Sequence, residues 1–371
     1  MGPVHEMRRN VQSYAFPLPG PGTEPWPRRG RAVPGKGSGR GLATGAIAVI
    51  VTCLTLPALA DDTHLDSLGF PADCTLGRTC FIQQYVDRDP GPGIADFTCG
   101  TLTYDGHSGT DIRLKDDAAM TRGVAVLSAS DGVVLGLRDG MRDQRQGTPG
   151  APDISNRDCG NGVLIEQADG MQLQYCHLRR GSITVHKGDL VTQGQVLGQI
   201  GLSGRTQFPH LHLTVRSAAG AVIDPFDARQ QDASCTFPDR EDLWRDLDAS
   251  DYQPGGLLDA GFSRAVPEYD AIRQGGAAND TLLDRDAPAL VYWVHYFGLR
   301  NGDAIGLTLM APDGSVIAQS SHRMKKDRAV EFRAAGRKAR GPWPSGDYTG
   351  VTTLTRDGAV IERSEHRLSL P

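Results

Sequence analysis

The sequence predicts a mostly β protein, with a compact cysteine-bonded β domain followed by a smaller β-sandwich of Ig-like type. Gly (46) and Pro (23) are frequent among the 371 residues while aromatic residues make up only 6%, which is typical of turn-rich β proteins. Short apolar runs alternate with Asp-Gly turns along most of the chain. Beyond residue 60 all cysteines lie between Cys74 and Cys235, which suggests one bonded unit ending near residue 240.

The first 60 residues are predicted to be an N-terminal extension and secretory signal. Residues 1–41 are rich in Pro, Gly and Arg, and the apolar run LATGAIAVIVTCLTLPALA (42–60) ends in Ala58-Leu59-Ala60. This order predicts cleavage after Ala60 and a periplasmic or extracellular location. An uncleaved anchor is the alternative, since the run could nearly span a bilayer.

Charge argues against nucleic acid as a partner. Seven Lys/Arg and two Asp/Glu fall within residues 1–60, so the cleaved chain keeps 32 basic and 42 acidic residues, a formal net charge of −10. Phosphate backbones and anionic membrane surfaces select for basic proteins.

The cysteines indicate disulfides. An even number behind a secretory signal favours up to three bonds, and the chain lacks the CxxC pairs of a zinc cluster. A short loop would be closed by Cys74–Cys80, and Cys159 and Cys176 flank a predicted hairpin, which leaves Cys99–Cys235. The candidates are Cys74, Cys80, Cys99, Cys159, Cys176 and Cys235.

Strand and turn signals divide the cleaved chain into four parts. Residues 61–99 form a disulfide-containing cap, 100–240 the first β domain, 241–285 a linker and 286–371 the sandwich. In the first domain we expect a hairpin over 161–178 turning at Gly170, short strands over 124–137 and 183–204, and a long surface loop over 138–158. In the sandwich we expect a strand over 289–298 and hairpins over 305–321 and 346–370.

The sandwich holds a concentration of aromatic residues in a chain otherwise poor in them. They could form a recognition surface for a protein or glycan ligand, but alternation buries half of each strand, so most are expected to fill the core. These residues are Tyr292, Trp293, Tyr296, Trp343 and Tyr348.

The stretch FPHLHLTVR (208–216) places two histidines side by side. Leu211, Leu213 and Val215 alternate with His210, His212 and Thr214, so a strand would turn the imidazoles to one face and the apolar residues to the other. Such a pair alone is more often a hydrogen-bonded polar face than a metal site.

Two further motifs supply partners for the histidine pair. YDGHSGTD contains His107 and Asp111, and YCHL contains His177. A catalytic zinc takes three protein ligands, often two His and one carboxylate, and keeps one position open. His107, Asp111 and one histidine of the pair would supply that set, and the remaining imidazoles would face the open position.

The motifs HSGTD, YCHL and HLH, in this order, resemble the lysostaphin/LytM-type zinc metallopeptidases of bacterial cell walls. VAVLSASDGVV and VHKGDLVTQGQVLGQIGLSGRT resemble the strand and glycine-turn framework of the same family, so the resemblance covers roughly residues 100–225. It implies a compact, mostly antiparallel β domain that cleaves peptidoglycan stems or cross-links.

The resemblance also implies a role for each polar residue. His107, Asp111 and His212 would bind one zinc per chain, and His177 and His210 would be the catalytic histidines that are not ligands. The alternatives are a weak or inactive member of the fold that activates another wall hydrolase, and an envelope structural protein with a stabilising metal. Degenerate members lose ligands, and structural zinc sites prefer four protein ligands, so an active enzyme is the favoured prediction.

Overall fold

The computed structural model describes residues 67–229, 241–247, 251–277 and 284–371. Within these residues the fold is mostly β, as predicted, and all the pairings between named strands are antiparallel. The same residues contain no helix long and apolar enough to cross a membrane. The predicted signal over 1–60 lies outside them.

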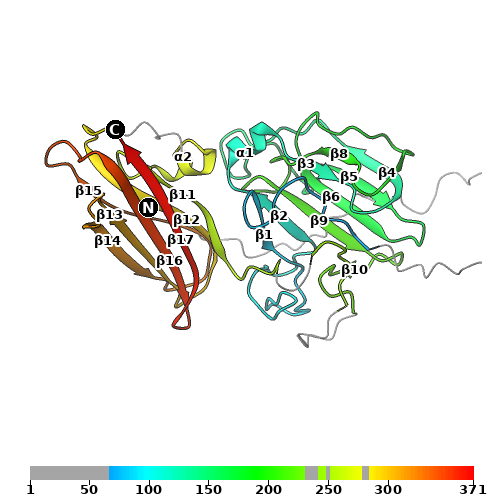
Figure 1. Cartoon of the computed structure of the whole chain (residues 1–371). Helices are drawn as coiled ribbons and strands as arrows, with labels where there is room; N and C mark the ends of the chain where they lie inside the picture. The colour runs from blue at the N-terminus through cyan, green and yellow to red at the C-terminus, as the bar shows by residue number, and fades with distance from the viewer. Residues whose placement is uncertain (1–66, 230–240, 248–250, 278–283) are drawn as a thin grey trace, which may run out of the picture. The chain divides into compact units, whose positions relative to one another are not determined.

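An eight-stranded antiparallel sheet forms the centre of the first domain (Figure 1). Its strand order is β1-β2-β9-β6-β5-β4-β7, and β10 pairs with the end of β9. The strands are β1 (Cys80–Gln84), β2 (Thr110–Leu114), β4 (Gly132–Arg138), β5 (Asn161–Glu166), β6 (Gln172–Leu178), β7 (Leu190–Val191), β9 (His210–Arg216) and β10 (Val222–Ile223). A helix, α1 (Asp117–Arg122), follows β2, and β3 (Ala125–Leu127) pairs with β8 (Val196–Gln199) in a separate two-stranded sheet.

The two faces of β9 differ as the alternation predicted. Leu211, Leu213 and Val215 are fully buried in the core of the domain. His210 and His212 point to the opposite face. β9 lies between β2 and β6, so His212 pairs with Asp111 on one side and Cys176 on the other. His210 pairs with Arg113 of β2 and forms an isolated bridge with Gly201.

Two of the predicted disulfides are present. Cys74 bonds to Cys80, and Cys159 bonds to Cys176 across the predicted hairpin, which β5 and β6 form. Cys99 is also disulfide-bonded. Cys235 lies outside the described residues, so the pairing Cys99–Cys235 stays a prediction.

The chain beyond residue 240 differs from the expected linker, because residues 241–247 pack onto the first domain. Leu68 N–H donates to the carbonyl of Leu243 (2.6 Å), and Arg245 N–H donates to the carbonyl of Leu68 (2.9 Å). Trp244 is 6% exposed and belongs to the apolar core of the domain. Little in the sequence indicates this contact, because a single tryptophan in a polar segment shows no periodicity.

Trp244→Ala should therefore lower the free energy of unfolding of the first domain by about 3–5 kcal/mol, because it leaves a large cavity in a packed core. Chemical denaturation followed by circular dichroism measures the change. Glu241→Ala is the matched control, since the Glu241 side chain is exposed, and it should change stability by less than about 0.5 kcal/mol. Equal stability of the two variants would show that residues 241–247 are dispensable.

Two antiparallel sheets make up the second domain. β11 (Gly256–Ser263), β12 (Ala289–Leu299) and β15 (Arg328–Lys338) form one sheet, in that order. The other has the order β14-β13-β16-β17, with β13 (Ala304–Met310), β14 (Val316–Arg323), β16 (Gly346–Arg356) and β17 (Ala359–Leu370). The predicted strand and both hairpins appear as β12, β13–β14 and β16–β17. β11 and the helix α2 (Tyr269–Gln274) lie in the segment expected as linker.

Four of the five aromatic residues singled out in the sequence fill the core of the second domain, and Trp293 is buried in a separate cluster with Ile272 of α2. Apolar residues of β12, β13 and β16 form one buried cluster, so the two sheets face each other as in a sandwich. The aromatic residues are at most 5% exposed, which supports the core interpretation and leaves no aromatic recognition surface among them: Tyr292, Trp293, Tyr296, Trp343 and Tyr348.

Candidate active site

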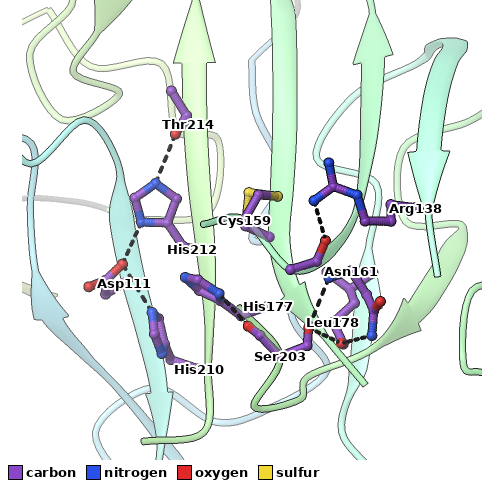
Figure 2. Close-up of a disulfide and its surroundings, with 12 residues drawn as sticks. Asp111, Arg138, Cys159, Asn161, His177, Leu178, Ser203, His210, His212 and Thr214 are labelled. Atoms are coloured by element: carbon purple, nitrogen blue, oxygen red, sulfur yellow. Dashed lines mark hydrogen bonds and ion pairs between the residues drawn. A yellow bond between two sulfur atoms is a disulfide. The ribbon is translucent and has the colours of Figure 1, made fainter. Parts of the chain in front are cut away.

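The structure brings together all five polar residues singled out in the sequence. Asp111 lies on β2 and is the direct cross-strand partner of His212 on β9. His210 is two residues before His212 on the same face, and His177 is the second-last residue of β6, on the other side of β9 (Figure 2). His107 comes from the loop before β2. All five side chains belong to buried residues.

Three atoms converge on one point. His107 Nε2 lies 3.2 Å from Asp111 Oδ1 and 3.2 Å from His212 Nδ1, and His212 Nδ1 lies 2.8 Å from Asp111 Oδ1. Ligand atoms about 2.0–2.1 Å from a tetrahedral zinc are separated by about 3.3 Å. The three atoms are therefore spaced as zinc ligands are.

The other ring nitrogens of the two histidines have partners that favour this arrangement. His107 Nδ1–H donates to the carbonyl of Tyr85 (2.7 Å), so the lone pair of a neutral His107 is on Nε2. His212 Nε2 lies 2.9 Å from the hydroxyl of Thr214, which can accept its N–H and leave the lone pair on Nδ1. Carbonyl and hydroxyl partners of this kind orient metal-binding histidines. Three acceptors facing one another at such distances require a cation between them, either a proton or a metal.

Electrostatics favour a positive charge among these three side chains. Burial works against the charge of Asp111, but attraction to His107 and His210 outweighs it and holds the carboxyl pKa well below its usual range. For His107 burial lowers the pKa, and the carboxylate of Asp111 outweighs burial, so the pKa is raised. Burial lowers the pKa of His212, which keeps it neutral and able to bind a metal.

The remaining two imidazoles lie beside these three atoms. His177 Nδ1–H donates to the carbonyl of Ser203 (2.7 Å), and His210 Nδ1 lies 2.9 Å from the carbonyl of Phe208. Both rings therefore keep an Nε2 lone pair, and His210 Nε2 is 3.5 Å from Asp111 Oδ1 (Figure 2). Burial lowers the pKa of His210 and lowers that of His177 well below its ordinary value, so both rings are neutral. His177, His210 and His212 form a second group within metal-binding distance, so the residues could hold a metal in either set.

Only one of the hydrogen-bond partners of these histidines could be predicted from the sequence. Thr214 shares the strand face of His210 and His212, so the alternation of FPHLHLTVR already pointed to it. Tyr85 and Ser203 act through backbone carbonyls, which any residue has, and no sequence pattern could have found them. His186 is exposed and does not join the site.

A glycine lets the first motif approach the site. A Cβ on Gly109 would lie 2.6 Å from His212 Cε1 and Nε2 and 2.7 Å from the carbonyl oxygen of Leu213. Contacts this short force one of the partners to move, and the carbonyl is part of β9 and cannot. The sequence HSGTD therefore uses glycine where the loop passes against the ring of His212.

Gly109→Ala should weaken zinc binding at least about 10-fold, because the new methyl group displaces His212. Competition against a fluorescent chelator measures the affinity. Gly136→Ala is the control, since a Cβ there would meet nothing within 4 Å, and it should bind zinc as the wild type does. Unchanged zinc affinity in Gly109→Ala would mean that His212 does not need its observed position.

Two histidines and one carboxylate, with two further neutral imidazoles beside them, are a donor set that fits a zinc hydrolase. Residues 105–225 match the model of Peptidase family M23. The match confirms the resemblance to lysostaphin/LytM-type peptidases.

A curated relative is the peptidoglycan DD-endopeptidase ShyA of Vibrio cholerae serotype O1, 33% identical over 106 residues. The match covers 29% of this chain and 19% of ShyA, so it spans about a fifth of that protein. Solved structures with similar folds include the catalytic domain of the prophage-encoded M23 protein EnpA from Enterococcus faecalis, at 20% identity over 40% of this chain and 91% of that chain, with a TM-score of 0.28. Another is a zinc-containing peptidase from Vibrio cholerae, at 26% identity over 42% of this chain and 41% of that chain, with a TM-score of 0.25.

Proposed function

We propose that this protein is a secreted zinc metalloendopeptidase that hydrolyses peptide bonds in peptidoglycan stems or cross-links. The observation that carries the proposal is the convergence of His107 Nε2, Asp111 Oδ1 and His212 Nδ1 at 2.8–3.2 Å. Two other neutral imidazoles next to this group give it the acid–base groups that a hydrolase needs. The match to ShyA, a peptidoglycan DD-endopeptidase, supports the substrate class.

His107, Asp111 and His212 are the residues that would hold one zinc per chain. Zinc bound by three protein ligands lowers the pKa of a coordinated water to about 7 and polarises a substrate carbonyl. The three ligands carry a single negative charge between them, from Asp111, so they leave a net positive charge at the metal. We prefer this set to the one with His177, because its ligand atoms include a carboxylate and lie within 3.2 Å of one another.

His177 and His210 would act on protons. In each ring Nδ1 is hydrogen-bonded to a backbone carbonyl. Each ring can therefore accept a proton at Nε2, the nitrogen that points toward the ligand group. The imidazolium formed in this way stabilises negative charge on the substrate and can return the proton to the leaving amine. Their rings are close together, with centroids 4.6 Å apart, so both can reach one scissile bond.

The long loop over 138–158 would border the substrate site. Gln144 N–H donates to the carbonyl of Leu202 (3.0 Å), Gln146 N–H donates to that of Thr206 (3.0 Å), and Gln207 Nε2 donates to that of Gln146 (2.7 Å). The loop is thus fastened to the segment that leads into His210. We propose that it selects among wall peptides by limiting the width of the site.

The second domain would take no part in the chemistry. Among the described residues, both groups that could hold a metal lie in the first domain. A protein or glycan ligand for the second domain, and a periplasmic or secreted location after cleavage near Ala60, belong to the same proposal.

Digestion of purified sacculi tests the function. The zinc-loaded protein beginning at Asp61 should release muropeptides whose masses identify a hydrolysed peptide bond, and a chelator should stop the release. A protein that binds zinc and sacculi but releases nothing alone, and that stimulates another wall hydrolase, would instead be a regulatory module.

A further inference from the structure

We propose that the disulfide Cys159–Cys176 positions His177 for the reaction, so that Cys159 and Cys176 are positioning residues of the active site. The inference rests on the proposed role of His177. It goes beyond that role by assigning a function to a covalent bond in β5–β6 that is not a part of the metal site.

His177 has a backbone conformation that few residues adopt. Its φ is +64°, in the left-handed region, which costs free energy for any residue with a Cβ and persists only where the surroundings enforce it. The pairing of β5 and β6 shifts register between Asn161 and Gly162, directly opposite the end of β6. This irregularity turns His177 out of the ladder, as bulges beside active sites do.

Cys159 holds the backbone of His177 directly. The N–H of His177 donates to the carbonyl of Cys159 (2.8 Å), and the preceding residue, Cys176, is bonded to Cys159 through sulfur. Two consecutive residues of β6 are thus attached to one residue at the entrance to β5. The disulfide fixes the distance between β6 and the segment that enters β5. The hydrogen bond from His177 N–H then fixes the backbone of His177.

The ring of His177 is held by the same group of residues. Its Nδ1–H donates to the carbonyl of Ser203, and the hydroxyl of Ser203 accepts the N–H of Asn161 (2.9 Å) and donates to the carbonyl of Leu178 (2.8 Å). Asn161 Nδ2 donates to the same carbonyl of Leu178 (3.1 Å). Figure 2 shows the dashed contact between His177 and Ser203, with Asn161 and Leu178 beside Ser203.

Glycines bring the backbones around this disulfide close together. A Cβ on Gly160 would lie 2.5 Å from Gly204 N, and one on Gly162 would lie 2.4 Å from the carbonyl oxygen of Tyr175. At these two positions the segments meet backbone to backbone, with no room for a side chain. The disulfide crosses this closely packed region, and Cys159 and Cys176 are both buried.

The test compares C159A/C176A with C74A/C80A, which removes the other described disulfide of the same domain. In C159A/C176A, kcat should fall about 10- to 100-fold with KM within about twofold, because His177 is misplaced while the rest of the site is intact. Zinc content should stay at that of the wild type. C74A/C80A should keep kcat.

Nuclear magnetic resonance gives the readout that a merely structural bond would not change. The His177 ring of the wild type should show a single Nδ1–H tautomer and a protected amide. C159A/C176A should show mixed tautomers and amide exchange at least about 10-fold faster, while C74A/C80A resembles the wild type. These signals test the positioning role independently of activity. If the wild type cleaves no wall peptide, the proposed function fails but the positioning role is still tested by the signals of His177.

A second route covers the case in which C159A/C176A does not fold. A phosphine reduces the bond in the wild type without substituting any residue: with one water molecule it becomes the phosphine oxide, and the two sulfurs become thiols. Reduction of Cys159–Cys176, checked by mass, should produce the same change in the His177 signals. The proposal is overturned if these signals are unchanged without the bond, if zinc is lost with it, or if C74A/C80A loses as much kcat.

Discussion

Asp111→Ala should lose zinc and activity together. Asp111 Oδ1 contacts ring nitrogens of His107, His210 and His212 within 3.5 Å, so it is the one negative charge among these side chains. Losing an outer partner of a metal ligand costs about 10- to 100-fold in metal affinity, so losing the ligand itself should cost more. Elemental analysis after dialysis should find less than about a tenth of the wild-type zinc.

Asp105→Ala is the matched control for this loss. Asp105 carries the same side chain in the loop before β2 but is exposed, so its removal should leave zinc content and activity unchanged. Full zinc retention in Asp111→Ala would remove Asp111 from the ligand set and favour the alternative group of three histidines.

His177→Ala and His210→Ala should each keep the zinc and lose about 10²- to 10⁴-fold in kcat. The two rings stand beside the ligand group and act on protons, so their removal takes away acid–base catalysis and not metal binding. Zinc content and single-turnover rates on a wall peptide separate the two effects.

His186→Ala is the control for these two variants, because His186 is exposed and outside the site, and it should keep both zinc and activity. One result would reverse the assignment within β9. If His210→Ala emptied the site and His212→Ala did not, His210 would be the ligand and His212 the proton carrier.

The sequence predicted which polar side chains would lie together better than it predicted the backbone contacts that hold them in place. Alternation in β9 placed His210 and His212 on one face, because every strand has a period of two residues. The left-handed conformation of His177 could not be predicted, since it depends on contacts with Cys159 and Ser203 that come from other segments. Any residue can accept a hydrogen bond through its backbone carbonyl, so such a contact cannot be predicted from residue type.

Domain limits were harder to predict for a related reason. β11 contains two glycines and weak alternation, and most of its hydrogen bonds come from pairing with β12, which begins 26 residues after the end of β11. Residues 241–247 are held by Leu68 and by the burial of Trp244. In both segments the tertiary partner, more than local propensity, decides the structure.

The separation of paired strands along the sequence also sets the order in which this domain can fold. Asp111 and His212 are 101 residues apart, whereas the cysteines of β5 and β6 are 17 apart. Closing the longer loop costs about 1.6 kcal/mol more entropy, and such distant pairings form slowly. The β5–β6 hairpin can therefore close, with its disulfide, before β9 arrives beside β2. A zinc ion then has no complete set of ligands until the last central strand is in place, so metal capture belongs to the end of folding.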